Sequence, residues 1–153
     1  MEQGDPRMKN RPYRSLVNSL LYISTGTRPD IAFSVCQLSR HLEKPSEEHW
    51  NAAIRVLRYL KTTASNGIIY QGRKNWIRTS AYSDADWASN NDSRKSISGT
   101  MVMSNESPVA FKSKYQQSVA LSNAEAEYMA LSLCIQQILW LKNSLTEMKV
   151  QVR

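Results

Sequence analysis

Hydrophobic residues recur every three or four positions between residues 12 and 65, and this spacing predicts three amphipathic helices. Pro12 stands near the start of the first helix, where its missing N–H costs no hydrogen bond. The second is expected to open at Thr27, with Asp30 three positions later completing a box-like cap. The third is expected to follow Ser46, its N-cap. The predicted inner faces are Tyr13, Leu16, Val17, Leu20 and Leu21 in the first helix, Ile31, Val35, Leu38 and Leu42 in the second, and Trp50, Ile54, Leu57 and Leu60 or Lys61 in the third.

From residue 67 onward the pattern shortens to strand-length segments separated by turn residues. Residues 67–72, GIIYQG, predict a short strand that ends in a turn. Three further strands are expected at 77–84, 97–104 and 108–112. In the first of these three, alternation puts Tyr82 and Asp84 on one face and Ile77 and Ala81 on the other. Antiparallel pairing in sequence order is the simplest topology.

The last predicted element is a long helix whose start is marked by a capping box. Ser122 and Glu125 have the S-x-x-E spacing that satisfies the first free N–H groups of a helix. An apolar run then continues to about Met148, through Tyr128, Leu131, Cys134 or Ile135, Ile138, Leu141 and Leu145. A helix that is apolar on several sides needs a larger covering surface, and we expect more sheet against it.

These elements predict an α+β chain in which an N-terminal helical segment precedes a β-β-β-α unit. The composition, 41% hydrophobic and 22% charged, is that of a globular protein and excludes a disordered chain. The expected organisation is a flexible leader at 1–11, a helical segment at 12–65, a linker strand and turn at 66–76, and a folded unit at 77–153.

Segments that would target or cross a membrane are not expected. No apolar run approaches the ~18–20 residues of a spanning helix, and the N-terminus has no apolar core of a secretory signal. We therefore predict an intracellular protein, in cytoplasm or nucleus. Cys36 and Cys134 lie in separate apolar stretches, which predicts two buried thiols and no disulfide. His41 and His49 are interpreted as isolated residues of helix surfaces or ends.

The net charge of +7 is concentrated in the N-terminal half of the chain. Residues 1–75 hold 12 Lys and Arg against 6 Asp and Glu, whereas residues 76–153 hold 8 against 7. A basic half fits a partner with a phosphate backbone, although a generic basic surface has the same composition. Arg55, Arg58 and Lys61 of the third predicted helix are the candidate phosphate contacts, with a solvated helix face as the alternative.

Three carboxylates are candidates for chemistry. Asp84 and Asp86 stand at the end of a predicted strand in YSDADWA, and Glu127 stands in the first turns of the last helix. Carboxylates gathered at a strand end and a facing helix can hold Mg²⁺. A turn-forming aspartate and a glutamate beside the helix dipole are the structural alternatives. Glu125 already has a capping role, which makes Glu127 the better candidate ligand of the two.

Several segments together resemble the copia-type retrotransposon Pol polyproteins. Residues 12–61, which run from PYRSLV to RYLK, are similar to the thumb or connection-like segment that follows the polymerase palm. Three later segments are similar to the ribonuclease H region, namely YSDADWASNNDSRKSISG at 82–99, PVAFKSKYQQSVALSNAEAEYMAL at 108–131 and ILWLKNSL at 138–145. Because these motifs occur in the family's order, the resemblance covers roughly residues 11–147.

The resemblance implies a ribonuclease H-like fold that cuts the RNA strand of an RNA–DNA hybrid during reverse transcription, with two Mg²⁺ ions as cofactors. It puts the family's catalytic, metal-binding residues at Asp84 and Glu127, and it makes Asp86 a further candidate metal residue. The family has another acidic residue on a later strand, in a C-D-N-like motif. This chain has no aspartate after Asp92 and no polymerase Y-x-D-D motif, so we expect an inactive fragment.

Two other functions stay open at the level of sequence. One is a non-catalytic nucleic-acid-binding module retained from a transposon, for which salt-sensitive binding without cleavage would be evidence. The other is a partner-binding helical scaffold. The expected partners are an RNA–DNA hybrid or other nucleic acid and the remainder of the Pol polyprotein, with no membrane.

Overall fold

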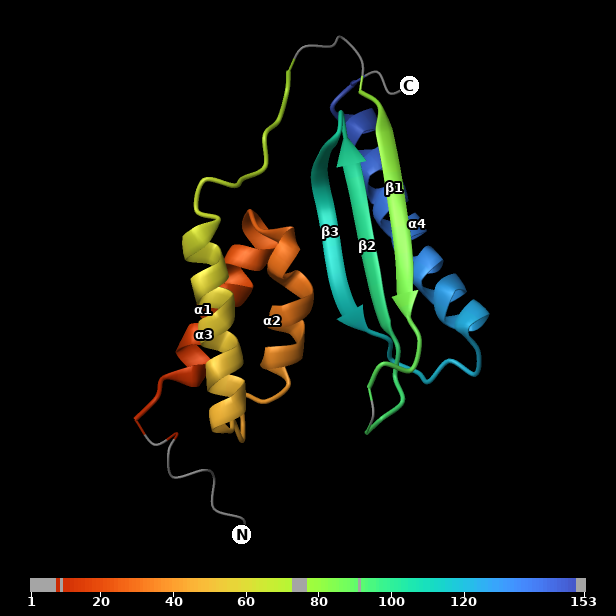
Figure 1. Ribbon diagram of the computed structural model, residues 1–153. Helices are drawn as coiled ribbons and strands as arrows, with labels where there is room; N and C mark the ends of the chain where they lie inside the picture. The colour runs from red at the N-terminus through yellow and green to blue at the C-terminus, as the bar shows by residue number, and fades with distance from the viewer. Residues whose placement is uncertain (1–7, 9, 73–76, 91, 151–153) are drawn as a thin grey trace. The chain divides into compact units, whose positions relative to one another are not determined.

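The structure of the protein is a computed structural model with an α+β architecture, as predicted (Figure 1). It describes residue 8 and residues 10–72, 77–90 and 92–150. The chain divides into two compact units, Met1–Gly67 and Ile68–Arg153. The N-terminal unit is helical, and the C-terminal unit contains a three-stranded sheet and a long helix.

Two predictions concern segments at the margins of these ranges. Most of the leader expected at residues 1–11, and residues 73–76 of the linker expected at 66–76, fall outside the described residues. Within the described part of the chain, none of the helices combines the length and the apolar character that a membrane crossing requires.

The N-terminal unit is built from α1 (Tyr13–Gly26), the short 3₁₀ helix η2 (Pro29–Ile31), α2 (Ala32–Ser39) and α3 (Glu47–Thr62). Two predicted helix starts are confirmed, because Pro12 is the N-cap of α1 and Ser46 is the N-cap of α3. The Ser46 hydroxyl accepts the His49 backbone N–H, and the His49 ring accepts the Ser46 N–H at 2.9 Å. Histidine thus takes the place of glutamate in a capping box.

The predicted start of the second helix at Thr27 is wrong. Thr27 follows the end of α1 as its C-cap, and α2 begins only at Ala32, after η2. Pro29 explains the interruption, because a residue that precedes proline is disfavoured in the helical region. Asp30, which was expected to cap the helix, instead forms an ion pair with the Arg28 guanidinium at 2.7 Å.

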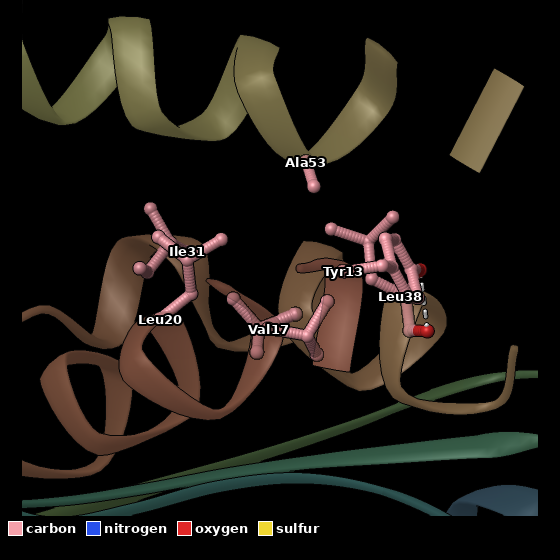
Figure 2. Packing of buried hydrophobic residues seen from close by; sticks show 7 residues of the cluster. Tyr13, Val17, Leu20, Ile31, Leu38 and Ala53 are labelled. Atoms are coloured by element: carbon pink, nitrogen blue, oxygen red, sulfur yellow. Dashed lines mark hydrogen bonds between the residues drawn. The ribbon is translucent and has the colours of Figure 1, made fainter. Parts of the chain in front are cut away.

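The core of the N-terminal unit forms where the inner sides of its helices meet (Figure 2). Its buried side chains are Tyr13, Val17, Leu20, Ile31, Val35, Leu38 and Ala53. The Tyr13 hydroxyl donates a hydrogen bond to the Leu38 carbonyl at 2.8 Å, and burial raises the pKa of Tyr13. Most predicted inner-face positions of the first two helices are confirmed by this list.

Two predicted inner-face residues are wrong, since Leu21 is 42% exposed and Leu57 is 44% exposed. The buried residue of α3 is Ala53, with Trp50 and Leu60 partly buried against the same core. Ala53 contributes little to a hydrophobic pattern, but its small side chain lets α3 approach the other helices closely. The inner face of α3 is therefore centred on an alanine that the sequence pattern overlooked.

The Arg28 side chain connects the end of α1 to the end of α3. Its guanidinium donates to the Asp30 carboxylate, to the Thr63 carbonyl at 3.1 Å and to the Thr63 hydroxyl at 2.6 Å. It lies over the Tyr59 ring, and the Tyr59 hydroxyl donates to Asp30 at 2.9 Å. Arg28 is buried, so these contacts replace the water that a guanidinium would otherwise bind. The hydrogen bonds from Arg28 hold the pKa of Asp30 below its usual range.

The two histidines are paired, and the expectation that they are isolated is wrong. The rings of His41 and His49 stack with their centroids 3.8 Å apart. The contact depends on how the chain turns between α2 and α3, which no local pattern reports. The two cysteines are free, as predicted, but only Cys134 is buried and Cys36 is half-buried.

The sheet of the C-terminal unit has three antiparallel strands in sequence order, β1 (Thr79–Asp86), β2 (Ile97–Ser104) and β3 (Ser107–Tyr115). The predicted topology and second strand are confirmed, while the third strand is longer than predicted. Asn105 and Glu106 make the turn between β2 and β3, and both have positive φ angles. Two consecutive residues of this kind are what a tight hairpin with right-handed strand twist requires.

The short strand predicted at 67–72 is wrong, because these residues belong to no strand. Side chains hold the segment in place of a backbone ladder. The Tyr70 hydroxyl donates to the Pro108 carbonyl at 2.9 Å, and the Ser107 hydroxyl donates to the Ile69 carbonyl. Because Pro108 has no N–H, the start of β3 offers a neighbouring strand fewer backbone donors.

Helix α4 (Asn123–Glu147) runs along one face of the sheet (Figure 1). Its buried residues are Ala126, Ala130, Cys134 and Leu145. The Cys134 thiol donates to the Tyr82 carbonyl at 3.5 Å, and burial raises the pKa of this thiol. Tyr128, Leu131 and Ile135, which continue the predicted apolar run, are exposed. The first half of α4 meets the sheet through small side chains, Ala126, Ala130 and Cys134, whereas Tyr128, Leu131 and Ile135 lie outside this contact.

Replacing Asp30 by Asn is expected to lower the thermal unfolding temperature at pH 7. Because the pKa of Asp30 is lowered in the folded state, the ionised carboxylate stabilises the fold above its unfolded pKa. This stabilisation is lost as the pH falls through the lowered value, so the difference between wild type and variant should be largest at neutral pH and should narrow in strongly acidic solution. The measurement is far-UV circular dichroism against temperature across this pH range.

Glu43→Gln provides the control for this experiment, because Glu43 is an exposed carboxylate of the same unit. Its unfolding temperature should follow that of the wild type at every pH. A difference between wild type and Asp30→Asn that stays constant from neutral to strongly acidic solution would contradict the ion pair.

Candidate functional site

The three candidate carboxylates lie on two elements of the C-terminal unit. Asp84 and Asp86 are in the last three residues of β1, opposite Gly99 and Ile97 of β2. Both aspartates are exposed, and Asp84 alternates with the buried Ala85 as the strand pattern predicts. Glu127 lies in the first turns of α4 and is half-buried.

The end of β1 is joined directly to the start of α4. The indole N–H of Trp87, one residue beyond β1, donates to the Ala120 carbonyl at 3.1 Å. A buried cluster of small side chains fills the space between strand and helix: Ala85, Ala120, Ala126 and Ala130. Ala85 stands between the two aspartates and Ala126 precedes Glu127, so the structure brings all three carboxylates to the same end of the unit.

The three carboxylates do not project from the same surface. Ala85 packs against α4, so alternation directs Asp84 and Asp86 to the opposite face of β1. Glu127 belongs to the helix on the Ala85 side. β1 is an edge strand of the described sheet, which leaves the space beside it open to groups from both faces.

Gln116 positions this end of the unit, and no sequence pattern indicated it. It is buried just beyond β3, and its side-chain amide donates to the Ser98 hydroxyl and to the Ala126 carbonyl, both at 2.9 Å. Its backbone N–H donates to the Ser96 carbonyl. One side chain therefore links β2 to the helical turn that carries Glu127. A buried glutamine could have been found only through its partners, which are distant in sequence.

The predicted capping box of α4 forms with one change. The Ser122 hydroxyl accepts the Glu125 N–H at 3.1 Å, as predicted. The Glu125 carboxylate accepts the N–H of Leu121 at 2.7 Å, one residue before the N–H that a capping box uses. Glu125 is thus engaged in the start of the helix, which is consistent with the choice of Glu127 as the candidate ligand.

The donor chemistry at this end of the unit fits a hard cation. Asp84, Asp86 and Glu127 offer only carboxylate oxygens, which Mg²⁺ prefers, and this ion commonly takes one or two protein carboxylates together with waters and phosphate. Among the described residues, no group of three or more His, Cys, Asp and Glu side chains could jointly hold a metal ion. The described part of this chain therefore supplies at most a pair of carboxylate ligands to one ion.

The basic candidates lie on α3 of the N-terminal unit. Arg55, Arg58 and Lys61 are all exposed, and their spacing of three residues keeps them close along the helix surface. Arg28, by contrast, is buried and committed to Asp30.

Comparison with known proteins identifies relatives over most of the chain. The protein named Secreted RxLR effector protein 161, from Plasmopara viticola, is 45% identical over 134 residues, which are 88% of this chain and 94% of that protein. The retrovirus-related Pol polyprotein from transposon RE2 of Arabidopsis thaliana is 39% identical over 92% of this chain. That from transposon TNT 1-94 of Nicotiana tabacum is 40% identical over 96% of this chain. No family model and no solved structure matches the chain.

The fold defines an α+β chain with one helical unit and one β-β-β-α unit. The chain belongs to the same family as Secreted RxLR effector protein 161, and its similarity to the two Pol polyproteins supports an origin in a retrotransposon Pol polyprotein. The predicted polyprotein origin is thereby confirmed. The chain spans 10% and 11% of the length of the two Pol polyproteins.

Enlarging the alanine contact should separate α4 from β1. Ala126→Leu is expected to lower the free energy of unfolding by about 1–3 kcal/mol, because a fully buried alanine has no room for three added carbons. Ala124→Leu adds the same atoms at an exposed position of the same helix and should change the free energy of unfolding by less than ~0.5 kcal/mol. The measurement is urea denaturation of both variants. Equal losses from the two substitutions would contradict the close packing.

Proposed function

We propose that the C-terminal unit is a ribonuclease H-like unit of a copia-type Pol polyprotein, which in the intact family hydrolyses the RNA strand of RNA–DNA hybrids. The junction of β1 with α4 carries the proposal, because it collects Asp84, Asp86 and Glu127 at one end of the unit. The S-D-A-D-W-A and A-E-A-E-Y-x-A-L motifs contain these same residues. In this proposal the N-terminal unit is the thumb or connection-like segment of the reverse transcriptase.

Asp84 and Glu127 are the residues that would hold Mg²⁺, with Asp86 as a further oxygen donor. When bound, the ion lowers the pKa of a coordinated water and stabilises the leaving oxygen of the phosphodiester. The chain contributes by orienting the carboxylates, since Trp87 fixes the end of β1 and Gln116 fixes the first turn of α4. Recognition of the hybrid would rest on backbone shape and the RNA 2′-hydroxyl.

The 153 residues offer few carboxylates for a site of this kind. A two-metal site holds its ions with carboxylates from several elements, whereas the described residues contain no group of three suitable side chains. We therefore expect the 153-residue polypeptide to bind the ion weakly and to leave a hybrid uncut when it acts alone.

Binding of Mn²⁺, a paramagnetic substitute for Mg²⁺, tests the ligand assignment without requiring activity. Asp84→Asn and Glu127→Gln should each weaken binding at least ~10-fold, a loss typical even of outer-shell partners. Asp92→Asn removes the same charge from an exposed position in the loop after β1 and should leave binding unchanged. Electron paramagnetic resonance of the free ion gives the dissociation constant. If all three variants weakened binding equally, the loss would reflect net charge alone, and the assignment of Asp84 and Glu127 as ligands would be wrong.

Incubation with a labelled RNA–DNA hybrid in Mg²⁺ or Mn²⁺ tests the activity itself. The wild-type polypeptide is expected to leave the RNA strand intact. Metal-dependent cleavage that disappears in both Asp84→Asn and Glu127→Gln would show that the 153 residues assemble a working site. The nuclease assignment would then stand, and the expected inactivity would be wrong.

A non-catalytic nucleic-acid-binding module is the second candidate function. The exposed Arg55, Arg58 and Lys61 on α3 favour it, because phosphate contacts need only accessible cations and no precise geometry. Binding through these cations is possible whether or not the carboxylate site cleaves RNA, so binding is measured separately from cleavage.

Salt dependence of hybrid binding tests this second function. Arg55→Gln combined with Arg58→Gln should reduce the slope of log K against log salt by about 1.5–2, as expected for two lost phosphate contacts. Lys112→Gln combined with Lys114→Gln removes two exposed charges from β3 and is the matched control. Fluorescence anisotropy across a salt series measures both slopes. A similar drop for the control pair would refute a specific role of α3.

A further inference from the structure

One side of α4, next to the side that faces the sheet, carries a row of exposed and mostly apolar residues. Tyr128, Ile135 and Lys142 are spaced by seven residues, about two helical turns, so they lie along one line of the helix. Leu131 and Ile138 fall between them, and the five residues form what we call the α4 seam. Tyr128 is 72% exposed and Ile135 is 45% exposed. This heptad spacing is that of a helix that packs lengthwise against another helix.

A cleft of about 480 Å³ adjoins the C-terminal end of the α4 seam. Ile138 and Lys142 belong both to the seam and to the wall of this cleft, and Leu141, Leu145 and Ala81 of β1 are also in the wall. The lining is mainly apolar, with one cation, Lys142, and the hydroxyls of Thr79, Ser80 and Thr146. An aromatic ring suits such a cleft, because it buries a large apolar surface and its face attracts an ammonium group.

We propose that the α4 seam binds the α4 seam of a second copy of this chain, antiparallel, with the two-fold axis at Ile135. Tyr128 and Lys142 are each seven residues from Ile135, so this pairing sets Tyr128 of one copy against Lys142 of the other. The exposed Tyr128 ring then enters the cleft of the opposite copy. Each copy supplies both the protruding ring and the cleft, which is the self-complementarity that a two-fold interface needs.

Charges at the two ends of α4 favour the antiparallel over the parallel arrangement. The first turns contain Glu125 and Glu127, whereas Lys142 and Lys149 lie near or just beyond the end of the helix. In an antiparallel pair, the acidic start of one helix lies beside the basic end of the other, and the two helix dipoles point in opposite directions; both effects are attractive. In a parallel pair, charges of the same sign would lie side by side. Glu147 lies about 120° around the helix from the axis residue and does not face the partner.

Sedimentation equilibrium of the 153-residue chain over a range of concentrations tests the association. The wild type is expected to show a monomer–dimer equilibrium. Ile135→Asp places two charges at the axis and should raise the dimer dissociation constant at least ~100-fold. Trp140→Gln is the matched control, because Trp140 is 60% exposed on the same helix but lies about 140° around it from Ile135. Far-UV circular dichroism verifies that both variants are folded.

Disulfide trapping tests the arrangement at the axis. Ile135→Cys should form a covalent dimer, because only the residue on the axis meets its own copy. Tyr128→Cys should not, since the two Tyr128 positions would be about 21 Å apart along the helices, beyond the reach of a disulfide. The unchanged chain, with its native thiols Cys36 and Cys134, gives the background level.

Three results would overturn the proposal. One is a wild-type chain that stays monomeric at every concentration. Another is a loss of association by Trp140→Gln equal to that by Ile135→Asp. The third is equal trapping of Ile135→Cys and Tyr128→Cys, which would indicate a parallel pair or random collision. None of these outcomes depends on the acidic site, so the proposed nuclease function is tested independently.

Discussion

The close approach of α4 to β1 is the contact on which the candidate site depends. The buried side chains at that contact are all small, with Ala85 on the strand and Ala126 and Ala130 on the helix. The approach is close enough for Trp87 to donate to the carbonyl of Ala120, just before the helix. Asp84 and Asp86 are the chain neighbours of Ala85, and Glu127 is the chain neighbour of Ala126. The alanine contact therefore brings the three carboxylates to one end of the unit without any direct contact between them.

In each unit, a buried polar side chain with several hydrogen bonds joins segments far apart in sequence. Arg28 connects the turn after α1 with the end of α3 through Asp30 and Thr63. Gln116 connects β2 with the first turn of α4. A buried donor without a partner destabilises the fold, so such residues tolerate only the arrangement that satisfies them. Apolar packing supplies most of the stability, and these two residues favour the one apolar packing in which their hydrogen bonds are satisfied.

The two long sides of α4 have different consequences for function. The side with alanines faces the sheet and positions Glu127, whereas the side with Tyr128 and Ile135 is exposed. The relatives show the same stretch of sequence in two contexts, as about a tenth of a Pol polyprotein and as most of a shorter protein. A surface of this kind can take different neighbours in the two contexts, because its own fold leaves it uncovered.

The sequence by itself determined the features that depend on neighbouring residues. Helix starts were predictable at Ser46 and Ser122 because caps act within one turn, and the order of the strands followed from alternation and short connections. Tertiary structure alone decided which small residues are buried, as at Ala53 and Ala126, because their burial depends on how closely two elements approach. Small side chains permit the closest approach and yet give the weakest hydrophobic signal. Asp30 shows the same limit, since packing brought Arg28 and Tyr59 to a carboxylate that local reasoning had assigned to a cap.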